Sequence, residues 1–153
     1  MSDEFSVFLA TDLGVGEVAG RLRQLLEGRP VAEAAGDGEV GLRVRAADGE
    51  GWLEVHVHRN WHVLTDQEPG EAQAVDPYSV QVDVSGGEGE ARGVFERLVE
   101  TGVGMPMLLV HDVTDLVAAY LPDAGTHYFP AGVSMDEPDL EQWRDWVSEV
   151  RMG

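Results

Sequence analysis

Strict alternation of apolar and polar residues is the feature that most limits how this chain can fold. Residues 40–45, 53–58 and 78–84 alternate in this way. A period of two residues is typical of a β-strand that turns one face to the core and the other to solvent. Residues 5–10 and 105–110 are instead almost continuously apolar, which indicates strands buried on both faces. The chain is therefore predicted to contain at least five strands.

Helices are predicted between these strands. Residues 15–26 and 91–99 place their apolar side chains at the i, i+3, i+4, i+7 spacing of an amphipathic helix. We expect a further short helix over residues 114–121, ended by Pro122, and a C-terminal helix that begins near Pro138.

An internal repeat suggests how these elements are arranged. Residues 14–20 and 87–93 both read G-x-G-E-x-x-G, and each copy follows a predicted strand and opens a predicted helix. We interpret the central glycines of the repeat as positions where each helix packs closely on a sheet. The repeat favours one α+β domain over 1–153, a ferredoxin-like split β-α-β sandwich with an antiparallel or mixed sheet and two helices on one face. Residues 1–112 would form its β-α-β-β-β-α-β core, and 113–153 a C-terminal helical extension.

Acidic residues greatly outnumber basic ones. The 153 residues include 29 Asp or Glu and 10 Arg, with no Lys and no Cys, so the formal net charge is −19. Such a chain repels phosphate groups, which argues against nucleic acids and anionic membranes as partners and favours a basic protein or a cation. Genome composition or adaptation to salt could also produce this acidity. The acidic start has no positively charged signal region, and no apolar run approaches the roughly 20 residues of a membrane span, so we expect a cytoplasmic protein.

One polar cluster has the composition of a metal site. Glu54, His56 and His58 alternate along a predicted strand and would share one face, and His62 follows four residues later. Two imidazoles and a carboxylate can bind a divalent metal. The alternative is a solvent-exposed strand face without a metal, and in that case we expect no cofactor.

We predict from these features a non-enzymatic protein that binds a basic partner, most simply a bacterial immunity or antitoxin protein that neutralises a toxin. Trp61, Asp66, Glu68 and Glu71, together with Trp146, are the predicted contact residues, because exposed tryptophans among acidic residues are typical binding anchors. Two alternatives remain open: a metal-binding protein or metal-dependent enzyme that uses the histidines, and a homodimeric scaffold that pairs through its sheet.

Overall fold

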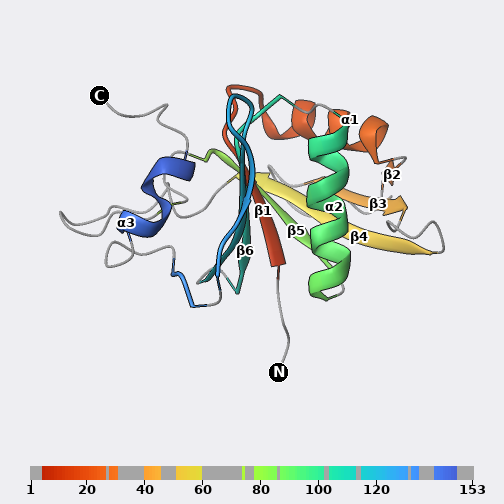
Figure 1. Cartoon of the computed structure of the whole chain (residues 1–153). Coiled ribbons are helices and arrows are strands. Elements are labelled where there is room, and N and C mark those ends of the chain that lie inside the picture. Colours follow the sequence, from red (N-terminus) through yellow and green to blue (C-terminus); the bar gives the residue numbers. More distant parts are fainter. Residues whose placement is uncertain are drawn as a thin grey trace.

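An eight-stranded sheet forms the centre of the structure, which is a computed structural model (Figure 1). The structure describes residues 5–26, 28–30, 40–45, 51–59, 74, 78–85, 87–101, 104–112, 115–130, 132–134 and 140–147. The strands are β1 (Phe5–Leu9), β2 (Arg29–Pro30), β3 (Val40–Arg45), β4 (Trp52–Arg59), β5 (Val80–Val84), β6 (Met107–His111), β7 (Asp115–Leu121) and β8 (Gly125–Tyr128). The helices are α1 (Val15–Leu25), α2 (Glu88–Glu100), α3 (Leu140–Trp143) and the 3₁₀ helix η3 (Arg144–Trp146).

The strand order overturns the predicted fold class. The strands lie in the order β2-β3-β4-β5-β1-β6-β7-β8, and each neighbouring pair is antiparallel. The prediction of a ferredoxin-like two-helix sandwich with extra C-terminal helices is therefore wrong, because the chain after residue 112 extends the sheet by two strands. Of the predicted C-terminal helix, the described residues show the single turn of α3 followed by η3.

Residues 115–121 form strand β7 and not the predicted short helix. Strand β6 is buried on both faces and needs a partner on each edge, and β1 and β7 supply these partners. Pro122 does not end a helix but lies in a hairpin turn. In that turn the Ala124 N–H donates to the Leu121 carbonyl (3.0 Å), and Gly125 has a φ of 89°. Glycine adopts this left-handed conformation without the steric cost of a Cβ.

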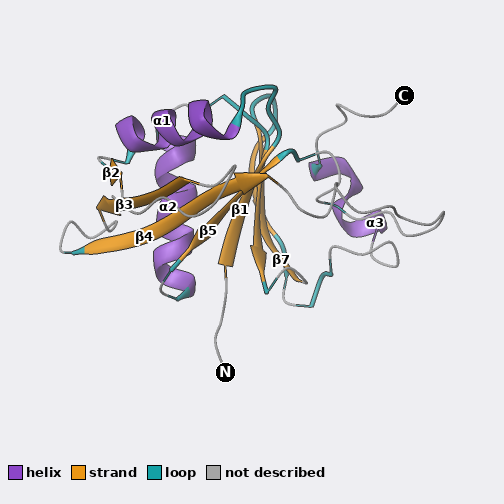
Figure 2. Cartoon of the chain, turned by 180° about the vertical axis from the view of Figure 1, so that it is seen from behind, coloured by secondary structure: helices purple, strands orange, loops and turns teal. Residues whose placement is uncertain are grey.

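The two faces of the sheet are covered by different parts of the chain. Helices α1 and α2 lie on one side of the sheet, and α3 lies on the other (Figures 1 and 2). Helix α1 contacts β3 and β4, whereas α2 contacts β1 and β6. The opposite face has a second apolar cluster over β1, β6 and β7, which includes Phe8, Tyr78, Phe129, Trp143 and Val147. The sheet is thus the middle layer between two separate apolar clusters.

The central glycines of the repeat do not have the predicted packing role. A Cβ added at Gly16, Gly20 or Gly89 would meet no atom within 4 Å, so close packing does not require glycine there. What the two copies share is a hydrogen bond at the start of the helix. The Gly14 N–H donates to Glu17 Oε1 (3.3 Å), and the second copy repeats this bond at the start of α2 (3.2 Å). The three-residue spacing from glycine to glutamate that the two copies share therefore reflects helix capping by the glutamate.

Candidate functional site

The predicted histidine face lies on β4, on the side of the sheet opposite α1 and α2. Glu54, His56 and His58 alternate with valines that belong to the helix-covered core. Glu54 and His56 are exposed, but His58 is only 1% exposed, so the three side chains do not form one solvent-exposed face. His62 lies outside the described residues.

His58 belongs to a polar network that spans three strands. Its Nε2 lies 2.8 Å from Asp83 Oδ2 on β5, and its Nδ1 lies 2.7 Å from the carbonyl oxygen of Arg59. The other carboxylate oxygen of Asp83 accepts hydrogen bonds from the Ser6 hydroxyl (2.7 Å) and from Gln81 Nε2 (2.8 Å). His58, Ser6 and Gln81 are all buried, whereas the Asp83 side chain is 43% exposed. We call these four side chains the His58–Asp83 network.

The partners of His58 determine its protonation in this arrangement. A carbonyl oxygen and an ionised carboxylate only accept hydrogen bonds, so both ring nitrogens donate and the ring is an imidazolium. Burial alone would raise the pKa of Asp83, but the hydrogen bonds from His58, Ser6 and Gln81 and the charge of His58 together lower it. The pair is thus an ion pair with one buried member.

The network does not have the geometry of a hydrolytic triad. In a triad the histidine receives the proton of the serine hydroxyl, and the carboxylate holds the other ring nitrogen. Here the Ser6 hydroxyl donates to Asp83, and His58 makes its bonds to Asp83 and to a backbone carbonyl. Because both ring nitrogens of His58 carry hydrogen, the histidine has no lone pair to accept a proton. The arrangement suits a structural role across three strands.

The metal-site prediction now depends on fewer residues. A metal ligand needs a free lone pair on an imidazole nitrogen, and in the network His58 offers none. Among the described residues, no group of three or more His, Asp or Glu side chains is arranged to hold a metal ion. Glu54 and His56 are exposed and lie two positions apart on β4. The prediction therefore rests on these two side chains and on His62.

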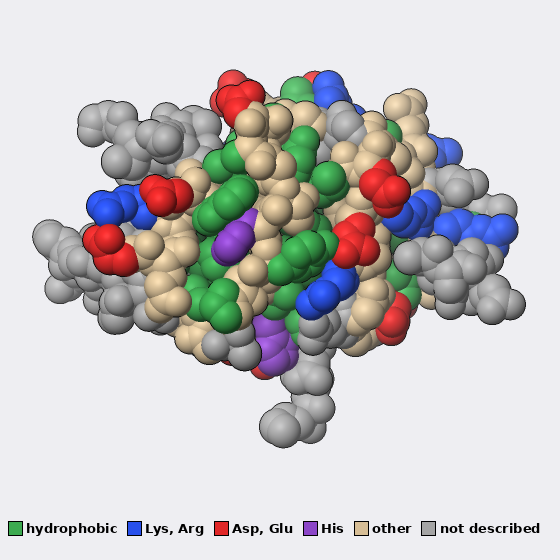
Figure 3. Space-filling model, in the orientation of Figure 1, with side chains coloured by type: hydrophobic (Ala, Val, Ile, Leu, Met, Phe, Trp, Pro, Cys, Tyr) green, Lys and Arg blue, Asp and Glu red, His purple; other side chains and the backbone are tan. Residues whose placement is uncertain are grey.

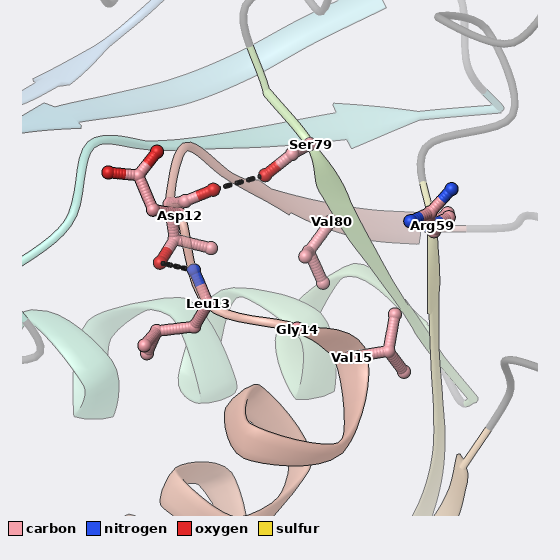
Figure 4. A pocket seen from close by; sticks show the side chains of 8 residues that line it. Asp12, Leu13, Gly14, Val15, Arg59, Ser79 and Val80 are labelled. Carbon is pink, nitrogen blue, oxygen red and sulfur yellow. Dashed lines mark hydrogen bonds between the residues drawn. The ribbon is translucent and has the colours of Figure 1, made fainter.

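A hollow of about 280 Å³ lies where β1 leads into α1 (Figure 4). It is lined by residues 11–15 together with Arg59, Ser79 and Val80. The Ser79 hydroxyl donates to the Thr11 carbonyl (2.7 Å), and the Thr11 hydroxyl accepts from the Leu13 N–H (3.1 Å), so both hydroxyls hold the loop in place. Asp12 and Arg59 lie at opposite sides of the hollow (Figure 4). Asp12 and Arg59 are the charged residues among those that line it.

Of the predicted contact residues, Trp146 is the one that the structure describes; Trp61, Asp66, Glu68 and Glu71 lie outside the described residues. Trp146 is partly buried in η3, and its ring stacks on that of His127 in β8, with 4.6 Å between centroids and an interplanar angle of 9°. The rings of His127 and Phe129 are nearly perpendicular, with 4.8 Å between their centroids. Trp146 therefore lies beside the outermost strand of the sheet.

Strand β8 carries a second aromatic group on its other face. Tyr128 is 43% exposed, and its hydroxyl donates to Glu96 Oε2 of α2 (2.5 Å). The guanidinium of Arg92 lies 5.2 Å from the centroid of the same ring. The sequence patterns predicted no strand in this segment. The residues Leu121-Pro122-Asp123-Ala124-Gly125 were a usable signal, because they are a typical hairpin turn between two short β-prone segments.

The acidic residues are distributed unevenly along the chain. Nine of the ten arginines but only thirteen of the 29 acidic residues are among the described residues. The described part is therefore close to charge balance. The other sixteen acidic residues, accompanied by one arginine, account for most of the net charge of −19, and Asp66, Glu68 and Glu71 are among them.

Helix length and external similarity give no further guide to the site. None of the described helices reaches the length and hydrophobicity needed to cross a lipid bilayer. Comparison with protein-family models, with curated proteins and with solved structures finds no match to this chain.

Proposed function

We propose that this chain is a non-enzymatic protein that binds a basic protein partner. The observation that carries the proposal is the net charge of −19, which comes from 29 acidic residues against 10 arginines. An acidic protein of this kind attracts a basic partner over distances of the Debye length, about 10 Å at moderate salt, and can raise the association rate by roughly 10- to 1000-fold.

Within this class, we propose an immunity or antitoxin protein that acts in the cytoplasm and neutralises a basic toxin. Electrostatic complementarity suits such a task, because the inhibitor must capture its target quickly and reject other partners. Trp61 and the acidic residues Asp66, Glu68 and Glu71 remain the proposed contact segment. Trp146 supports a second contact area beside β8, where it stacks on His127.

Affinity purification of the full chain from its native cells at low salt tests the binding proposal. We expect a stoichiometric protein with a basic isoelectric point that is released as salt rises, since screening weakens long-range attraction. Absence of a stoichiometric partner, or an acidic partner indifferent to salt, would contradict the proposal. For the immunity role, the partner expressed alone should arrest growth, and co-expression of this chain should restore it.

A matched pair of variants locates the acidic contact surface. The triple substitution Asp66→Asn, Glu68→Gln, Glu71→Gln removes three charges from the proposed contact segment. The control Asp12→Asn, Glu54→Gln, Glu100→Gln removes three exposed charges elsewhere. We expect the first variant to slow association by roughly three- to ten-fold and the control to have a smaller effect. Equal effects would show that net charge alone acts and that this segment is not the contact.

A further inference from the structure

The two edges of the sheet differ in their capacity to pair with another chain. At one edge, β2 has two residues, and its Pro30 has no N–H to donate. At the other edge lies β8, four residues long and without proline. A proline in the edge strand and a short edge strand are common ways to prevent a sheet edge from pairing. Strand β8 is short but contains no proline.

The hydrogen-bond pattern of the β7–β8 hairpin shows which backbone groups face outward. The Phe129 N–H donates to the Val117 carbonyl (2.9 Å), and Ala118 lies opposite Tyr128. In an antiparallel pair the bonded residues alternate, so His127 bonds to β7 whereas Thr126 and Tyr128 point their N–H and C=O groups away from it. The part of the chain that the structure describes offers these four outward groups no hydrogen-bond partner.

The side chains of β8 could receive those of an added strand on both faces. Tyr128 and Thr126 are exposed on the face that carries α2, and His127 stacks with Trp146 on the other. Hydrophobic side chains gather in the middle of the view in Figure 3, where the β7–β8 hairpin runs in Figure 1, and charged side chains lie around them. An added strand would place alternate side chains beside Tyr128 and beside the His127–Trp146 stack.

The acidic residues near β8 favour a basic segment as the added strand. Glu96 beside Tyr128, Asp123 in the hairpin turn and Asp145 next to Trp146 are all exposed. Arg92 lies over the Tyr128 ring. A second copy of this chain also has a net charge of −19 and would be repelled by the first as a whole, whereas a basic segment would be attracted. The favoured occupant is therefore an extended segment of a basic protein.

We propose that the basic partner binds by adding a strand to β8, with its backbone paired to the outward groups of Thr126 and Tyr128. This mode, in which backbone bonds give affinity and flanking side chains give selectivity, is a general way for sheets to recognise extended peptides. In an added strand of alternating basic and apolar residues, the lysine or arginine side chains would share one face and lie toward Glu96 or toward Asp145, according to the register. The inference rests on the proposed function and describes how the partner would bind at the second contact area, beside β8.

The test uses the full chain and a short synthetic peptide of alternating lysine and valine. We expect binding at low salt, with the Thr126 and Tyr128 amides protected from hydrogen exchange in the complex. A peptide of alternating glutamate and valine should not bind, and a Lys-Val peptide N-methylated on its alternate, β8-facing amides should bind about ten-fold more weakly, because it lacks backbone donors. Equal binding of the acidic or the N-methylated peptide, or no binding at all, would overturn the proposal.

Protein variants provide a second test. Thr126→Pro removes an outward N–H, and its matched control Thr126→Val keeps that N–H and the side-chain shape. Only the proline variant should lose about ten-fold in affinity. If the proline variant does not fold, the N-methylated peptide makes the same comparison on the wild-type chain. A dimer with the same two amides protected would replace the basic segment with a second copy and contradict the proposal.

The experiments distinguish failure of strand addition at β8 from failure of the proposed function. If a basic partner from the native cell binds while the amides of Thr126 and Tyr128 remain unprotected, the proposed function stands and the strand-addition inference fails. If no basic partner binds at all, the proposed function itself fails.

Discussion

The two faces of the sheet achieve stability by different means. The face under α1 and α2 is a continuous apolar core, in which Phe95, Leu98 and Val94 of α2 are buried against valines of the central strands. The opposite face is apolar over β6 and β7 but polar over β4 and β5, where His58 and Asp83 form their ion pair. The helix-covered face can accept other apolar side chains that fill the same volume. The hydrogen bonds of the polar part of the other face form only when the strands pair in one register.

The largest effect should come from the helix-covered face. Phe95 is fully buried, and Phe95→Ala would leave a cavity between α2 and the sheet. We expect the free energy of unfolding to fall by about 3–5 kcal/mol, measured by chemical denaturation. Glu100→Ala, at an exposed position on the same helix, is the control and should change it by less than about 0.5 kcal/mol. A loss for Phe95→Ala no greater than that of the control would show that α2 is not packed as described.

The polar face should respond less strongly but more specifically. Asp83→Asn keeps the shape of the side chain but removes the charge that pairs with the buried His58. We expect a loss of about 1–3 kcal/mol in the free energy of unfolding, because a buried donor loses its best acceptor. Asp123→Asn, an exposed position in the β7–β8 turn, should be nearly neutral.

A double-mutant cycle with His58→Ala separates the ion pair from general damage to the sheet. Because the two side chains are in direct contact, the losses of the single variants should not add in the double variant. Additive losses would mean that His58 and Asp83 stabilise the sheet independently, and the contrast between the two faces would then disappear.

Acid should weaken the polar face selectively. The pKa of Asp83 lies below its ordinary value of 3.8, so its contribution to stability is present at pH values above 3.8 and is lost as the pH falls through the lowered folded-state pKa. The stability difference between the wild type and Asp83→Asn should therefore shrink as denaturation is measured at successively lower pH, from 7 to below 4. A difference that stays constant over this range would show that the charge of Asp83 is not what the network uses.

Sequence patterns correctly predicted the strands and helices whose apolar and polar residues follow a regular period. Alternation placed β3, β4 and β5 close to where they lie, and helical spacing placed α1 and α2, because solvent on one face imposes the period on each segment separately. Residues 115–121 show the limit of this reasoning. Their sequence fits helix or strand, and pairing with β6 decides the outcome, which depends on a neighbour that the local pattern does not contain.

The candidate sites were less predictable for the same reason. The burial of His58 depends on Asp83, which is 25 residues away in sequence and which alternation alone marks as a solvent-facing residue. Likewise, Trp146 was predicted as a binding residue from its type, but its stacking on His127 depends on the fold of β8 against the C-terminal segment. Alternating polar residues show that a strand has a polar face. Only the residues opposite them on neighbouring strands show whether that face is exposed to solvent or buried.

The smallest expected effect is a gain in stability on the helix-covered side. Gly20 lies inside α1, is exposed, and has no atom within 4 Å of an added Cβ. Gly20→Ala should raise the free energy of unfolding by about 0.5–1 kcal/mol, because alanine loses less conformational entropy in a helix. Gly125 also has open space around it but a φ of 89°, so Gly125→Ala should instead cost about 1 kcal/mol. Denaturation of both variants decides the matter: a loss for Gly20→Ala would mean that this glycine has a packing role after all.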